Sequence, residues 1–140
     1  MTTAGTSRLR IGASIGLVLY VALLCVYSVV PGGTLGTGAV DLLPGRDLAA
    51  HGLAYGGLTL ILCCALGKGG AGKLTGPVLA VASSAGLAAA LELVQAFLPW
   101  RTFSVADLAA GIGGILFAAA CWLVWSRLEG RARARSSVSL

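Results

Sequence analysis

Four apolar stretches in the chain are each long enough to cross a lipid bilayer. A hydrocarbon core of about 30 Å is spanned by roughly 20 apolar residues in a helix. Stretches of that length lie at residues 11–30, 48–66, 77–98 and 105–125. Because 57% of the residues are hydrophobic and only 11% are charged, a soluble fold would lack the polar surface to cover its core. The chain is therefore predicted to be an integral membrane protein.

The predicted fold class is all-α, a polytopic bundle of four transmembrane helices in a single domain over residues 1–126. Backbone amides in lipid must be satisfied within a helix or a closed barrel, and continuous apolar runs without strict alternation favour helices. The first span is expected to stay uncleaved, because its apolar run exceeds that of a signal peptide. Residues 127–140 are expected to form a basic, disordered cytoplasmic tail that rests on anionic lipid headgroups.

The distribution of basic residues predicts the orientation of the bundle. Of the ten Lys and Arg residues, only Arg46 and Arg101 fall between spans one and two or between spans three and four. By the positive-inside rule the other eight mark the cytoplasmic side, which holds both termini. The same basic residues account for the net charge of +5, so nucleic acid is not an expected partner. Small residues on the spans, among them the Gly52 and Gly56 pair, predict close helix packing.

Polar residues at the predicted outer ends of the spans form the candidate site. A charge inside a membrane span is costly and therefore points to function. Because the loop between the third and fourth spans is short, those helices must be antiparallel neighbours, which brings their polar residues to one end of the bundle. The candidates in chain order are Asp47, His51, Tyr55, Glu92, Gln95, Arg101 and Asp107.

These residues form an ordered pattern that resembles a known family. The segments 47–55 (DLAAHGLAY) and 92–111 (ELVQAFLPWRTFSVADLAAG) are similar to the VanZ-like family of small bacterial membrane proteins. The resemblance covers roughly residues 47–120, with Gly111 at or beside a position where the family often carries Asn. It implies a multi-pass protein of the bacterial cytoplasmic membrane with a role in the cell envelope. The family is associated with resistance to the lipidated glycopeptide teicoplanin.

One hypothesis for the site is an outward-facing pocket that binds or modifies a lipid-linked or glycopeptide-like amphiphile. Asp47 would orient His51 as a general base, with Glu92 as acid or base and Asp107 as a further catalytic candidate. Arg101 would hold an anionic headgroup, and Gln95 and Tyr55 complete the substrate-binding candidates. No cofactor is predicted. A divalent metal held by the imidazole and the three carboxylates is a minor branch, because the chain has no compact ligand spacing.

The alternative hypothesis is a non-catalytic scaffold in which the same residues stabilise the helices. Asp47 would cap the second helix, and Ser104 with Asp107 would form a capping box at the start of the fourth. Glu92 lies inside a span, where capping does not apply, so its structural interpretation is an ion pair with Arg101 or His51. Proton transport is disfavoured, because the polar residues gather at one face and provide no path across the bilayer.

Overall fold

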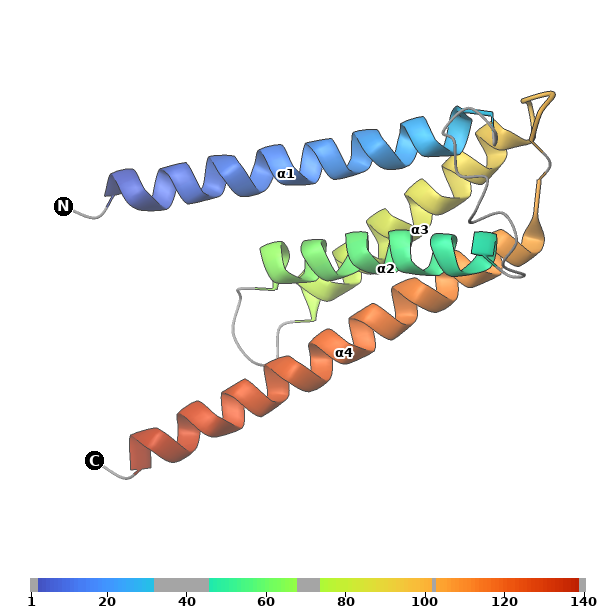
Figure 1. Ribbon diagram of the computed structural model, residues 1–140. Coiled ribbons are helices and arrows are strands. Elements are labelled where there is room, and N and C mark those ends of the chain that lie inside the picture. The colour runs from blue at the N-terminus through green and yellow to red at the C-terminus, as the bar shows by residue number, and fades with distance from the viewer. Residues whose placement is uncertain (1–2, 32–45, 68–73, 102, 139–140) are drawn as a thin grey trace.

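The structure, a computed structural model, describes residues 3–31, 46–67, 74–101 and 103–138, and all regular structure within these ranges is helical (Figure 1). The helices are α1 (Thr3–Val29), α2 (Arg46–Leu66), α3 (Thr75–Gln95) and α4 (Val105–Val138). Each contains a stretch that is long and apolar enough to cross a membrane. The predicted all-α fold with four membrane-spanning helices is confirmed.

Among the described helices, α2 and α4 share the most extensive contact, and their backbones approach closely at glycines. A methyl group added to Gly114 would lie 2.0 Å from the carbonyl oxygen of Gly52. One added to Gly56 would lie 2.9 Å from the carbonyl oxygen of Gly114, and one added to Gly52 would lie 3.4 Å from that of Ala110. The small residues predicted to let helices approach do so, and they join the second span to the fourth.

The apolar core lies where α2, α3 and α4 meet. Tyr55 from α2, Ala88 and Leu91 from α3, and Ile115 from α4 are buried against one another. Gly111 makes room for this core, since a methyl group there would lie 2.9 Å from the Tyr55 ring. Tyr55 is only 4% exposed, so this candidate for substrate binding is a core residue.

Helix α1 lies at the edge of this core and is attached mainly near its C-terminal end (Figure 1). Only 6% of its apolar stretch, Gly12–Val29, is buried. A methyl group added to Gly12 or Gly16 would have no atom within 4 Å. Midway along the helix, the Tyr20 hydroxyl donates to the carbonyl oxygen of Ala54 at 2.8 Å. The bundle is therefore a core of three helices with a peripheral fourth, because the small residues of α1 do not meet a matching face.

The C-terminal segment differs from the disordered tail predicted for residues 127–140. Helix α4 continues to Val138, and both termini lie at the same end of the bundle (Figure 1). Ala and Arg are favourable helix formers, and contacts one turn apart add to their effect. Trp125 donates to Glu129 at 3.0 Å, and Glu129 pairs with Arg133 at 3.5 Å.

Candidate functional site

Ser104 caps α4, and a residue from another helix completes the cap. The Asp107 N–H donates to Ser104 Oγ at 3.2 Å, which is the N-cap bond expected from the Ser-x-x-Asp pattern. In a capping box the Asp107 carboxylate would accept the Ser104 N–H in return. Here that N–H donates instead to Glu92 Oε1 of α3, at 2.5 Å. One half of the predicted capping box is therefore made by a carboxylate from a neighbouring helix.

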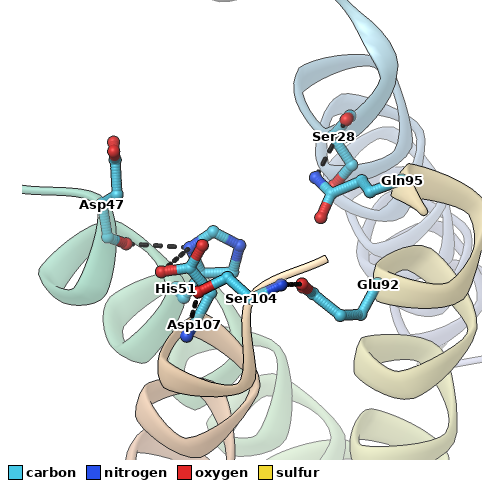
Figure 2. A network of polar contacts seen from close by, with 7 residues as sticks. All are labelled: Ser28, Asp47, His51, Glu92, Gln95, Ser104 and Asp107. Carbon is cyan, nitrogen blue, oxygen red and sulfur yellow. Dashed lines mark hydrogen bonds and ion pairs between the residues drawn. The ribbon is translucent and has the colours of Figure 1, made fainter. Parts of the chain in front are cut away.

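The Asp107 carboxylate does not accept the Ser104 N–H and faces α2 instead. Its Oδ1 atom lies 4.0 Å from Nδ1 of His51 (Figure 2). The two side chains are 14% and 22% exposed, so both remain accessible at the end of the bundle. The two helices are close beside this pair, because a methyl group added to Gly52, one residue beyond His51, would lie 3.4 Å from the carbonyl oxygen of Ala110, three residues beyond Asp107.

His51 is oriented by the backbone of its own helix. Its Nδ1 lies 2.8 Å from the carbonyl oxygen of Asp47. A carbonyl only accepts hydrogen bonds, so Nδ1 carries the proton, and Nε2 of a neutral ring then has a free lone pair. Figure 2 shows Nε2 on the ring edge turned away from Asp47 and toward α3. A neutral ring therefore presents Nε2, a proton acceptor, on the side turned toward α3.

The predicted role of Asp47 needs correction, because its main chain and not its carboxylate holds the imidazole. The Asp47 side chain points away from the ring (Figure 2). Helix α2 begins at Arg46, so Asp47 lies in the first turn and not at the N-cap position. A carboxylate in a first turn interacts favourably with the helix dipole. The carboxylate beside His51 belongs to Asp107.

Glu92 is the most deeply buried acid of the site, at 3% exposure. Its hydrogen bond to the Ser104 N–H ties α3 to the start of α4 (Figure 2). The expected ion pair with Arg101 or His51 does not form within the described part of the chain, where the partner of Glu92 is this backbone amide. A charge-assisted bond to a backbone N–H is stronger than a neutral one, which offsets part of the cost of burying the carboxylate.

Two of the predicted substrate-binding residues hold the C-terminal end of α1. The carbonyl groups at a helix end have no partner inside the helix. Gln95 at the end of α3, together with two side chains of the α3–α4 connection, satisfies four successive ones. Gln95 donates to Ser28 at 3.0 Å, Trp100 to Val29 at 3.0 Å, and Arg101 Nη2 to Tyr27 and Val30, both at 3.1 Å. The sequence offered no signal for Trp100, whose contact depends on where α1 ends in space.

A metal site does not assemble from the predicted ligands. Within residues 3–31, 46–67, 74–101 and 103–138, no three His, Cys, Asp or Glu side chains are placed to hold an ion. Asp107 approaches His51, whereas Glu92 bonds to Ser104 and the Asp47 carboxylate points elsewhere. The metal branch of the hypothesis gains no support from this arrangement.

The arrangement combines an accessible imidazole, a carboxylate beside it and a buried carboxylate that joins α3 to α4. Comparison of the chain with protein-family models, with curated proteins and with solved structures finds no match. The geometry of His51, Asp107 and Glu92 is therefore the main guide to function, beside the sequence motif.

Proposed function

We propose that this multi-pass membrane protein is a VanZ-like protein of the bacterial cytoplasmic membrane that acts in the cell envelope. Its polar site, at the end of the bundle opposite both termini, would bind or modify an amphiphilic or lipid-linked envelope substrate. Resistance to teicoplanin-type glycopeptides is the phenotype that the family resemblance implies. The ordered motif over residues 47–120 supports the family, and the site geometry supports the chemistry.

The observation that carries the proposal is the His51–Asp107 pair between α2 and α4. Nδ1 is engaged by the Asp47 carbonyl, and Nε2 is left as an acceptor that can take a proton from a substrate hydroxyl or ammonium group. The Asp107 carboxylate at 4.0 Å would stabilise the imidazolium that forms. A pair held only for packing would not need a side chain with an open ring nitrogen.

The surroundings of the pair suit an amphiphile. Phe103, which directly precedes Ser104, is 51% exposed, so an apolar chain of a ligand can lie against it. Arg101 uses Nη2 for the α1 carbonyls, and its Nε is buried without a partner among the described residues. That N–H would donate a hydrogen bond to an anionic headgroup if the connection shifts.

Expression in a glycopeptide-susceptible bacterium tests the proposal. The wild-type chain should raise the inhibitory concentration of teicoplanin more than that of a glycopeptide without a lipid chain. His51→Ala and Asp107→Asn should abolish this effect at unchanged protein levels in the membrane. Glu129→Gln removes one carboxylate at the far end of α4 and should behave as wild type. No change in susceptibility with the wild-type chain present in the membrane would contradict the proposal.

The scaffold alternative has one observation in its favour. Glu92, Gln95 and Arg101 all bond to backbone groups of other segments, as residues do when they fix helix positions. Under this alternative, Glu92→Gln and His51→Ala would lower the amount of protein in the membrane. Under the pocket proposal they would remove activity and leave that amount unchanged, so quantitative membrane immunoblots separate the two.

A further inference from the structure

One face of α4 is turned away from the other helices along most of its length. The opposite face carries Gly111, Ile115 and Ala118, which are buried against the bundle. Positions three and four apart share a helix face, and one such series is exposed throughout. Its members are Gly113, Phe117, Ala120, Val124, Arg127, Arg131 and Arg135. This series, the outer stripe, is apolar up to Val124 and entirely cationic from Arg127 onward.

The only acid in the C-terminal part of α4 lies across the helix from the outer stripe. Glu129 is two residues from both Arg127 and Arg131, which is a turn of about 200° around the helix. There it accepts from Trp125 at 3.0 Å and pairs with Arg133 at 3.5 Å. Arg133 is thus compensated by Glu129, whereas the arginines of the outer stripe have no carboxylate within ion-pair distance in the described part of the chain.

The direction in which α4 leaves the bundle bears on what the outer stripe can contact. Its 34 residues extend for about 50 Å, well beyond a hydrocarbon core of about 30 Å, so the helix must tilt or project from the bilayer. Figure 1 shows α4 diverging from the other helices toward its C-terminus. When a helix leaves a bundle leaning outward, the face turned away from the bundle is the one that faces the surrounding bilayer surface.

We propose that Arg127, Arg131 and Arg135 form a docking ridge for the phosphate headgroups of anionic phospholipids. The leaflet is the one at the end of the bundle that holds both termini. The stripe explains the choice of partner, because Phe117 and Val124 in its apolar half are 73% and 59% exposed and suit contact with lipid chains. A lipid beside Val124 has its headgroup level with the first arginines. Guanidinium groups bind phosphate through paired hydrogen bonds.

The ridge does not depend on the proposed function, because it lies at the other end of the molecule. Each basic residue near an anionic surface contributes enough to change lipid affinity by about fivefold. Arg133 should contribute much less, since Glu129 already compensates its charge. Arg133 is therefore a matched control for Arg131, because the two arginines are two positions apart and face opposite sides of one helix.

Native mass spectrometry of the purified full-length protein, titrated with phosphatidylglycerol or with phosphatidylcholine, tests the ridge. Arg131→Gln should weaken phosphatidylglycerol binding about fivefold, and Arg131→Lys should weaken it less. Arg133→Gln, with the same loss of charge, should weaken it less than twofold. Binding of phosphatidylcholine should not change in any variant. Equal losses in the two Gln variants, or equal affinity of the wild type for both lipids, would overturn the proposal.

Discussion

Substitution of Gly114 by alanine tests the contact on which the site depends. The added methyl group would lie 2.0 Å from the carbonyl oxygen of Gly52, 2.6 Å from its carbonyl carbon and 2.8 Å from its Cα. Ordinary contact begins at 3.4 Å, so the two backbones would have to separate by more than 1 Å. No side-chain rotation can relieve this overlap, because every atom involved belongs to the main chain.

The adjacent Gly113 isolates the effect of that contact. A methyl group there has no atom within 4 Å, so Gly113→Ala changes only the intrinsic preference for helix, a gain of about 0.5–1 kcal/mol. Gly114→Ala gains the same preference and adds overpacking, which costs about 1–3 kcal/mol and falls at the upper end here. The free energies of unfolding of the two variants should therefore differ by about 3 kcal/mol.

Reversible unfolding in mixed micelles, followed by far-UV circular dichroism as denaturing detergent is added, measures this difference. Gly114→Ala should unfold at a lower fraction of denaturing detergent than wild type, and Gly113→Ala at an equal or higher one. In the resistance assay Gly114→Ala should also lose activity, because separation of α2 from α4 draws Asp107 away from His51. Equal stability of the two alanine variants would refute the inferred contact between α2 and α4.

Two further predictions concern the hydrogen bonds at the same end of the bundle. Trp100→Phe removes the donor to the end of α1, so the free energy of unfolding should fall by about 1 kcal/mol. Amide hydrogen exchange should also become faster in the last turn of α1. As a control, Trp125→Phe removes a comparable indole hydrogen bond on α4 and should leave exchange in α1 unchanged. Glu92→Gln keeps an acceptor for the Ser104 N–H and should change the free energy of unfolding by less than about 1 kcal/mol. Glu92→Leu leaves that buried N–H without an acceptor and should lower the free energy of unfolding by about 2 kcal/mol. A comparable loss in both variants would show that the charge itself stabilises the fold.

The helices could be predicted from the sequence because their signal is local. Each apolar run satisfies its own backbone and reaches across the bilayer by itself, so its position in the chain is enough to locate it. The peripheral place of α1 could not be predicted in this way. Gly12 and Gly16 resemble the packing pair Gly52 and Gly56 in spacing, but only the second pair meets a matching face. Which small-residue faces meet depends on how the helices are arranged.

The C-terminal end of α4 is a second feature that could not be predicted from the sequence, since it is helical where disorder was expected. Composition classed residues 127–140 as too polar to pack, and polar segments without a core are usually disordered. The structure extends α4 to Val138, because helix propensity and the Glu129–Arg133 pair act within the helix and need no core. Charge alone also does not distinguish Arg131 from Arg133, which differ in the direction they face.

The sequence by itself determined the four spans, the glycine pair on the second span and the set of polar residues at one end. Only the tertiary structure decided how those polar residues pair. The Ser-x-x-Asp pattern assigns the reciprocal bond, from the Ser104 N–H, to the Asp107 carboxylate, yet any carboxylate that reaches that N–H can make the bond. Glu92 reaches it from α3. Asp107 is thereby left to face His51, a consequence of helix placement that no local pattern contains.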